Sequence, residues 1–201
     1  MARSAAFLLT LAMLFGCSSP EPAPPVPPDP VENTVTDIVT TVDMMRESLA
    51  LTIDSSETVD AQTFARVCRP VGQRAQAFAR PRGWTFQQLA QKNRNPANAL
   101  DAEAQQVHDA FASNPDRNEQ WMRTTRNGDK GWRYFRRITV QPSCMACHGA
   151  KDERPSFVKT GYPEDRAYGF EPGDLRGVYS VFVPDADANE DNANEDNAPL
   201  E

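Results

Sequence analysis

Three observations predict an α+β fold for this chain of 201 residues. Apolar residues recur at helical spacing near its start, a strong hairpin signal lies in its middle, and a strand rich in aromatic and β-branched residues comes near its end. Helices followed by a mostly antiparallel sheet, with one helix between its strands, define that class. The chain is 39% hydrophobic, and its length supports one domain of roughly 150 residues once the ends are removed.

The first elements are predicted to be helices. Over 35–53 the apolar residues follow three- and four-residue steps, which predicts an amphipathic helix. After Ser55 and Ser56 a second helix is predicted to begin near Thr58 or Asp60. Pro70 predicts a kink in it just beyond Cys68, because proline cannot donate the helical hydrogen bond.

The sheet is predicted to follow. Residues 84–90 alternate between apolar and polar as a strand does, and a third helix is predicted over 96–111. Segments 121–126 and 131–140 flank Asn127-Gly128-Asp129-Lys130, which is typical of a hairpin turn. The last strand is predicted over 176–183.

The N-terminus has the pattern of an export signal. Arg3 supplies the positive start, and the apolar run 5–15 is too short to span a bilayer. It ends in Leu14-Phe15-Gly16-Cys17, which resembles a bacterial lipobox and predicts a lipoprotein signal peptide over 1–16 with a lipidated Cys17. An ordinary signal peptide that is cut nearby is the alternative.

Between the signal and the body, 17–31 is predicted to be the lipidated cysteine with a proline-rich linker. Seven of the chain's 17 prolines lie in 18–30, a composition that favours a semi-rigid polyproline II spacer of roughly 40 Å. The folded domain is predicted over 32–184.

The formal net charge of −7 belongs to one end of the chain. Residues 185–201 hold seven acidic and no basic residues, whereas 1–184 hold 21 of each sign. This segment repeats Ala-Asn-Glu-Asp-Asn from Ala188 and is predicted to be a disordered, solubilising acidic tail. A neutral body argues against a nucleic-acid-binding surface, so no nucleic-acid partner is expected.

The motif Cys144-Met-Ala-Cys147-His148 is the C-x-x-C-H pattern of covalent c-type haem attachment. Two thiols at this spacing reach the two vinyl groups on one edge of a porphyrin, and the adjoining His148 points a ring nitrogen at the iron. A thioredoxin-like redox pair is disfavoured because the motif follows a hairpin, and a zinc site would need more cysteines or histidines. Export reinforces the haem interpretation, because c-type haem is attached outside the cytoplasm.

The sixth iron ligand is left open by the residues alone. Cys17 is assigned to lipid and Cys144 and Cys147 to thioethers, which leaves Cys68 either as a buried small apolar residue or as an axial ligand. The other candidates are His108 and the methionines Met44, Met45 and Met122.

Four stretches carry a resemblance to a known family. They are 67–71 around Cys68, 94–99 (Arg-Asn-Pro-Ala-Asn-Ala), 140–149 with the C-x-x-C-H motif, and 162–177 with Gly169-Phe-Glu-Pro-Gly-Asp-Leu-Arg-Gly. Over roughly 40–183 the chain resembles the PAS-like single-haem c-type cytochrome domains of photosynthetic and other bacteria, which occur alone or ahead of signalling modules.

The resemblance implies a PAS-like antiparallel sheet with N-terminal and flanking helices and one covalent haem c. It also implies that His148 and Cys68 are the axial ligands. Arg94 and Arg176 lie in the matching stretches and are the preferred partners of the haem propionates, because guanidinium pairs carboxylates in a bidentate way.

The expected function is therefore that of an exported, lipid-anchored monohaem c-type cytochrome in the bacterial cell envelope, facing the periplasm or the exterior. A thiolate ligand favours ferric iron and a low reduction potential, which suits a redox or gas sensor or a low-potential electron-transfer module. Its partners would be the membrane, through the anchor, and a redox or signalling protein. The alternative is a conventional electron-carrier cytochrome c with a His or Met sixth ligand. A peroxidase-type enzyme is not expected, because no distal acid–base residues stand out.

Overall fold

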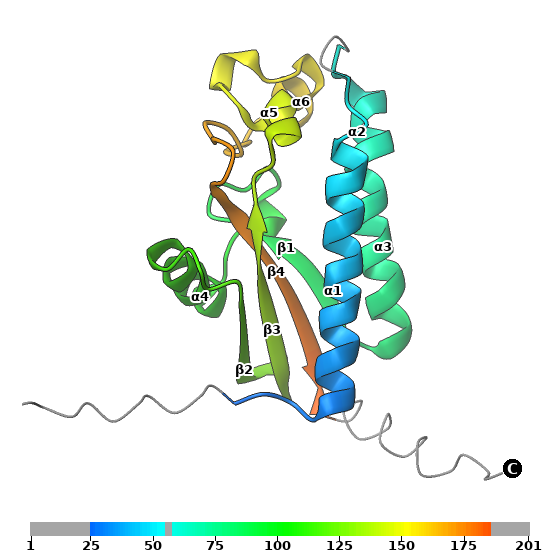
Figure 1. The fold of residues 1–201 in the computed structure, drawn as a ribbon, viewed down its shortest axis with the longest axis vertical. Helices are drawn as coiled ribbons and strands as arrows, with labels where there is room; N and C mark the ends of the chain where they lie inside the picture. The colour runs from blue at the N-terminus through cyan, green and yellow to red at the C-terminus, as the bar shows by residue number, and fades with distance from the viewer. Residues whose placement is uncertain (1–24, 55–57, 186–201) are drawn as a thin grey trace, which may run out of the picture.

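A four-stranded antiparallel sheet in the order β1-β4-β3-β2 forms the middle of the molecule (Figure 1). The computed structural model describes residues 25–54 and 58–185. The strands are β1 (Thr85–Leu89), β2 (Glu119–Arg126), β3 (Asp129–Thr139) and β4 (Leu175–Pro184). The α+β class predicted from the sequence is confirmed.

The predicted hairpin joins β2 to β3. Asn127 has φ 52° and Gly128 φ 96°, so both turn residues are left-handed, as in the tight turns that match the twist of paired strands. The last strand in sequence, β4, lies between β1 and β3. The beginning of β4 therefore lies beside the C-terminal ends of both neighbouring strands.

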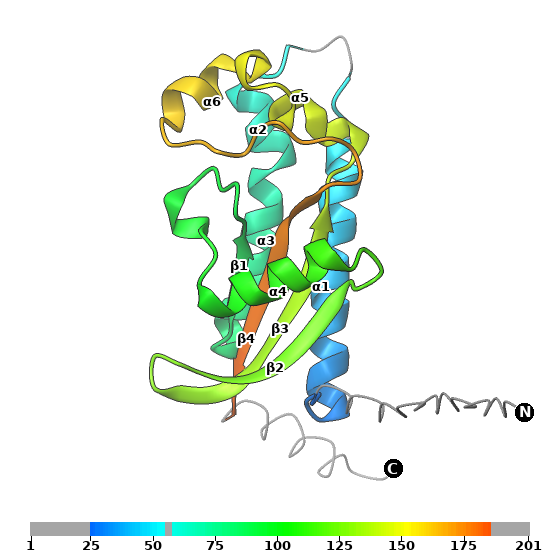
Figure 2. The same ribbon diagram turned by 90° about the vertical axis from the view of Figure 1, so that its left-hand side faces the viewer.

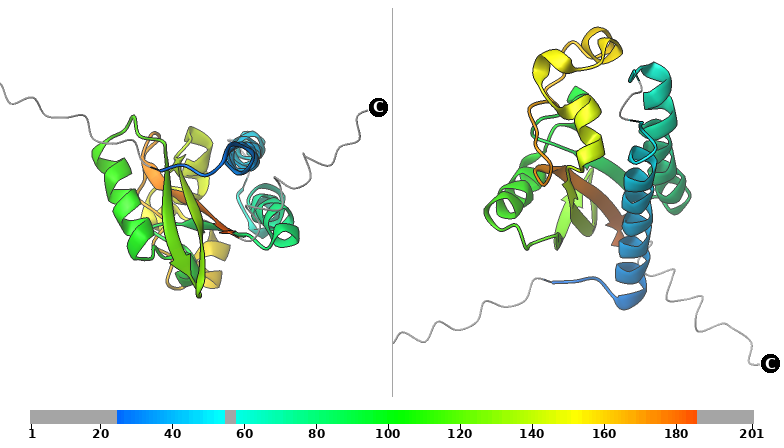
Figure 3. Two further views of the ribbon diagram at one scale, coloured as in Figure 1. Left: turned by 90° about the horizontal axis from the view of Figure 1, so that it is seen from below. Right: turned by 45° about the horizontal axis from the view of Figure 1, so that its top comes forward.

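Helices cover both faces of the sheet (Figures 2 and 3). The long α1 (Asp29–Ala50) and α3 (Arg69–Ala79) lie side by side on one face, and α4 (Ala102–Ser113) lies across the other. The larger core fills the α1–α3 side and includes Val35, Val39, Phe86, Tyr134 and Tyr179. A smaller core under α4 is built around Phe111 and Phe135.

The first helix begins earlier than predicted, at Asp29 instead of residue 35. Pro30 lies in its first turn, where proline's fixed φ suits a helix and its missing N–H costs nothing. Val31 and Val35 are fully buried and hold this first part of α1 in place. The last residues of the predicted 17–31 linker are thus helical. The signal peptide, Cys17 and the tail from residue 186 lie outside the described residues.

The predicted second helix is two helices, α2 (Ala61–Val67) and α3, which meet at Cys68. Asp60 caps α2 by accepting hydrogen bonds from the N–H groups of Gln62 and Thr63. Pro70 in the first turn of α3 cannot donate to the preceding turn, so the helical ladder is interrupted there. Cys68, between the two helices, keeps right-handed helical angles (φ −94°, ψ −37°), so the interruption is one residue long and lies where the kink is predicted.

The third predicted helix also begins later than expected. Pro96–Asn98 forms a separate 3₁₀ turn, and α4 begins at Ala102 because Asp101 caps it by accepting the N–H of Ala104. The same carboxylate accepts two hydrogen bonds, both of 2.8 Å, from the fully buried Arg133 of β3. This pair ties the start of α4 to the sheet.

Two short helices, α5 (Met145–His148) and α6 (Ser156–Gly161), form a lobe above one end of the sheet (Figure 1). Neither is predicted, because an element this short has no apolar periodicity to read. No helix in 25–54 or 58–185 is long and apolar enough to cross a membrane.

Candidate functional site

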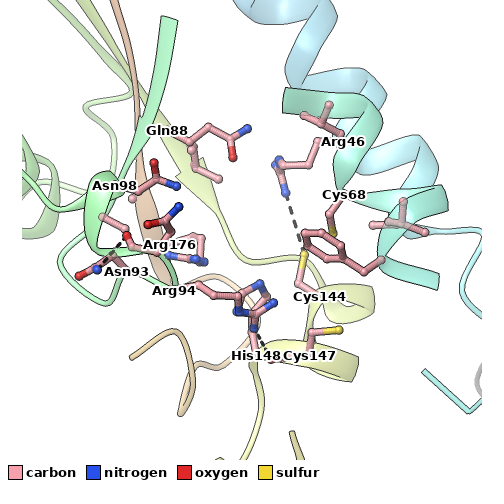
Figure 4. A pocket seen from close by; sticks show the side chains of 18 of the residues that line it. Arg46, Cys68, Gln88, Asn93, Arg94, Asn98, Cys144, Cys147, His148 and Arg176 are labelled. Atoms are coloured by element: carbon pink, nitrogen blue, oxygen red, sulfur yellow. Dashed lines mark hydrogen bonds between the residues drawn. The ribbon is translucent and has the colours of Figure 1, made fainter. Parts of the chain in front are cut away.

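One cavity of about 370 Å³ brings together the residues that the sequence singles out (Figure 4). It lies between the α5–α6 lobe and the upper ends of α1, α2 and α3, at the end of the sheet where β4 begins. Its lining includes the predicted haem-binding residues, which are Cys68, Arg94, Cys144, Cys147, His148 and Arg176.

The C-x-x-C-H motif occupies one short helical stretch. A 3₁₀ turn over Pro142–Cys144 runs directly into α5, so the motif winds through about one helical turn. Residues three and four apart share a helix face. Cys144, Cys147 and His148 accordingly all line the cavity.

His148 is held as a neutral imidazole with one nitrogen free. Its Nδ1 lies 2.7 Å from the carbonyl oxygen of Ala167. Because a carbonyl can only accept, Nδ1 carries the proton and Nε2 keeps its lone pair. Burial, followed by the charges of Arg176 and Arg94, lowers the pKa of His148 to about 3. The ring is therefore ready to coordinate a metal through Nε2.

The carbonyl of Ala167 is positioned by a buried carboxylate. The side chain of Asp165 is fully buried and accepts the N–H of Ala167 at 3.0 Å. It also accepts Nε of Arg94 at 3.3 Å and Nη1 of Arg154 at 2.8 Å. Burial alone would raise the pKa of Asp165, but these donors outweigh it and lower that pKa.

Arg94 connects this carboxylate to the motif. Its Nη2 donates to the carbonyl of Cys147 at 3.0 Å, while its Nε faces Asp165. The chain around Asp165 and the turn that carries His148 are thereby tied together through one side chain. Two donors of Arg94 are already used inside the protein, and its predicted role as a propionate partner stays a prediction.

Cys68 lines the cavity together with Phe64, Val67 and Val71, which lie on the same helical face at three- and four-residue spacing. The residue as a whole is exposed, yet the protein around its thiol desolvates it. This burial, together with the nearby Cys147, raises the pKa of Cys68 to about 11. The thiol is therefore protonated at neutral pH and would have to release its proton to bind a metal as thiolate.

The cavity wall has an apolar part and a polar part. The apolar part is formed mainly by Ala50, Ile53, Phe64, Val67, Val71 and Ile138. The polar part carries arginines and amides, chiefly Gln88, Asn93, Arg94, Asn98 and Arg176, whereas Arg46 lies on the helix side near Cys68 (Figure 4). This division suits a flat, largely apolar group that bears anionic substituents at one edge.

Arg176 is the cavity arginine without a carboxylate partner among the described residues. Its Nη1 donates to the carbonyl of Lys92 at 3.1 Å. Burial and the neighbouring Arg94 lower the pKa of Arg176 to about 10. A positive charge that is removed from water and has no anion beside it is destabilised in this way. The backbone here is unusually close-packed: Gly177 has φ 158°, and a Cβ on it would run into the carbonyl of Leu89.

Arg46 is a cavity residue that the sequence analysis did not identify. It lies on α1, pairs with Asp43 at 2.8 Å, and places Nη1 4.0 Å from Sγ of Cys144. A signal was available, because Arg46 is a base on the apolar stripe of its helix, four residues from the buried Val42 and Ala50.

The other candidate ligands lie elsewhere. His108 is buried on α4, on the opposite face of the sheet, and Met122 packs against the same α4 core. Within the described part of the chain no methionine lines the cavity, and His148 is its one histidine.

Comparison with known proteins places this fold and cavity in context. The Tll0287-like family model matches residues 29–184. The crystal structure of the cyanobacterial heme-protein Tll0287 is 40% identical in sequence, with a TM-score of 0.68. That match covers 79% of this chain and 97% of the other. No curated protein matches.

Replacing Asp165 tests the link between the chain around this residue and the turn that carries His148. Asp165→Asn is expected to lower the free energy of unfolding at pH 7 by about 3 kcal/mol, because it leaves two arginines with a weaker partner in a buried position. Glu164→Gln, on the exposed neighbouring side chain, is the matched control and should change it by less than about 0.5 kcal/mol. Urea unfolding followed by circular dichroism measures both.

The pH dependence of the free energy of unfolding gives a second test of the role of Asp165. Since the folded-state pKa of Asp165 is lowered, its stabilisation is present above the ordinary carboxyl pKa of about 3.9 and is lost as the pH falls through the folded-state value. The difference between wild type and Asp165→Asn should therefore shrink below about pH 4. Equal stability of the two proteins at pH 7 would contradict the role assigned to Asp165.

Proposed function

This chain belongs to the Tll0287-like family, and from that membership and its cavity we propose that it binds one haem covalently as a c-type cytochrome. Cys144 and Cys147 form the thioethers, His148 is the proximal ligand and Cys68 is the second axial ligand. The observation that carries the proposal is the meeting of these four side chains at one cavity.

The residues present fit this group. His148 offers Nε2 because its Nδ1 is bonded to Ala167, and thiols at the C-x-x-C-H spacing face the same space. The apolar wall suits the porphyrin body. Arg176, which is desolvated and lacks a carboxylate partner among the described residues, suits a propionate.

The proposed ligation determines the proposed role. The bound haem would supply a one-electron redox centre and, where an axial ligand leaves, a position for a small gas. A thiolate from Cys68 favours the ferric state and a low reduction potential. The raised pKa of the free thiol means that reprotonation favours its release. We therefore propose a redox or gas sensor, or a low-potential electron-transfer module, without catalytic turnover.

The alternative is a conventional electron carrier in which a histidine or methionine replaces Cys68. It is less well supported, because His108 packs on the far side of the sheet and the cavity lining includes no methionine among the described residues. A peroxidase-type enzyme would be supported by peroxide turnover in the ferric protein.

The proposal also includes the finer structural and cellular assignments. Support for a PAS-like fold comes from the antiparallel sheet with helices on both faces and α4 between β1 and β2. The sequence of the N-terminus supports export to the cell envelope with a lipid anchor at Cys17. The partner would be a redox or signalling protein at the membrane surface.

Replacing Cys68 tests the ligation. Cys68→Ser is expected to remove the thiolate signature from the low-spin ferric spectrum. It should also raise the reduction potential by on the order of 0.1 V, because axial ligands set potentials over a range of roughly 0.8 V. His108→Gln is the paired variant and should leave both properties unchanged. A spectrum that responds to His108→Gln and not to Cys68→Ser would favour the conventional carrier.

Replacing Arg176 tests the charge beside the haem. Arg176→Gln is expected to lower the reduction potential, because a nearby positive charge disfavours ferric iron. At an assumed separation of ~10 Å and an effective dielectric constant of ~20 the interaction is about 1.7 kcal/mol, or roughly 70 mV for one electron. Arg166→Gln removes an equal charge from an exposed neighbouring position and should shift the potential much less. Equal shifts in a spectroelectrochemical titration would argue against a cavity role for Arg176.

Replacing Cys17 tests the anchor. Cys17→Ala is expected to move the protein from the membrane fraction to the soluble fraction, because acyl chains supply most of the affinity for a bilayer. Immunoblots of separated fractions measure this, and mass spectrometry of the wild-type N-terminus shows whether the acyl groups are present. Retention of the variant in the membrane fraction would contradict lipid anchoring at this position.

A further inference from the structure

A run of 40 residues contains basic side chains without any acidic one. Between residues 61 and 100 the chain has seven arginines and lysines and no aspartate or glutamate. Two of the seven, Lys92 and Arg94, belong to the region of the cavity, and Arg66 is engaged elsewhere. The remaining four are Arg69, Arg74, Arg80 and Arg82, called here the α3 arginines.

The α3 arginines are exposed on α3 and on the 3₁₀ turn Arg80–Arg82 that follows it. Across 25–54 and 58–185, none of them forms an ion pair with a carboxylate. Arg74 lies 4.2 Å over the ring of Phe78, and Arg82 donates to the carbonyl of Phe78. These contacts involve the guanidinium groups, but neither partner is an anion that would balance their charge.

An excess of acidic residues lies at the C-terminal end of the chain. After Asp185, residues 186–201 contain six acidic residues and no basic one. Asp185 itself is bonded to Arg123 at 2.6 Å and 2.8 Å. The acidic segment is therefore attached to the domain by a carboxylate that already pairs with an arginine.

The sheet register sets Arg80, Arg82 and the start of the acidic segment at the same end of the molecule, whereas Arg69 begins α3 next to Cys68 at the cavity end. Thr85 pairs with Phe182 in antiparallel β1 and β4. The chain before Thr85, which contains Arg80 and Arg82, and the chain after Phe182, which leads to Asp185, therefore leave the sheet together. Figure 1 shows the C-terminal end of β4 and the end of α3 at the same lower end.

The acidic segment is long enough to reach along the whole of α3. Sixteen residues span up to roughly 50 Å when extended, whereas the 11 residues of α3 cover about 16 Å. A tethered segment of this length has an effective concentration in the millimolar range, so individually weak ion pairs can hold it.

We propose that the acidic segment 186–201 docks on the α3 arginines and occupies this surface in competition with external polyanions. The contact is electrostatic, so it forms at low ionic strength and weakens as the Debye length falls from about 10 Å at 0.1 M salt to about 3 Å at 1 M. It does not depend on the haem or on the lipid anchor.

Nuclear magnetic resonance of the full chain tests the contact. The comparison is between wild type and a variant in which the six acids of 186–201 become amides: D187N, E190Q, D191N, E195Q, D196N and E201Q. At 20 mM NaCl the Nε–Hε and backbone signals of Arg74, Arg80 and Arg82 are expected to differ between the two proteins. At 500 mM NaCl the difference should vanish. Differences confined to Arg123, Arg126 and Lys130 would place the segment on the β2–β3 hairpin and overturn the proposal, as would no difference at all.

Heparin affinity tests the competition. The amide variant is expected to bind a heparin oligosaccharide about tenfold more tightly than wild type at 50 mM NaCl. Adding R74Q, R80Q and R82Q to that variant should cancel the gain. Adding K151Q, K159Q and R166Q, which remove three exposed charges elsewhere, should leave most of it. If both triple sets reduce binding equally, only net charge matters and the proposal fails.

Discussion

One buried carboxylate holds the site together. Asp165 fixes the N–H of Ala167, whose carbonyl determines which nitrogen of His148 carries the proton, and through Arg94 it is tied to the carbonyl of Cys147. A fully buried charge is costly unless it is paired, and here two arginines and a backbone N–H pair it. The same contacts that stabilise Asp165 thus orient the imidazole of His148. Loss of the carboxylate would disturb the local fold and the position of the Ala167 carbonyl together, whereas the edge-on contact of Phe170 with the His148 ring would remain.

The opposite side of the cavity depends on a backbone interruption. Pro70 lacks the N–H that would donate to the preceding turn, so α2 and α3 meet at Cys68 without that hydrogen bond. Cys68 is the residue shared by both helix ends. Phe64, one turn earlier, packs on Phe157 and Tyr162 of the α6 region at centroid distances of 5.9 Å and 6.4 Å. A displacement of Cys68 would therefore be transmitted to these rings, which connect α2 to the α6 region.

Features with a local cause could be predicted from the sequence, and features with a distant cause could not. The C-x-x-C-H spacing and the Asn127-Gly128 turn are local and lie where predicted, and the prolines marked the break at Pro70. Two helix starts were misplaced by several residues: that of α1 depends on the burial of Val31, whereas that of α4 follows from the local cap at Asp101, a signal that the sequence analysis did not use. The bond between Arg94 and Asp165 joins residues 71 positions apart, and the contact of Arg46 with Cys144 joins residues 98 apart. No periodicity encodes such contacts, so sequence analysis could assign Arg94 to the site without showing that its donors are already used.

The arginines of this chain fall into two physical classes, and the difference bears on how each would respond to its surroundings. Burial and the charge of Arg94 lower the pKa of Arg176, so its positive charge is destabilised in the cavity. An anion bound beside it would stabilise that charge. The α3 arginines are exposed, so an anion gains little from any one of them and the gain depends on salt. The net charge of −7 therefore says little about either site. Binding of an anion to Arg176 inside the cavity should persist at high ionic strength, whereas binding of an acidic segment to the α3 arginines should not. The salt dependence of binding therefore distinguishes the buried site from the surface site.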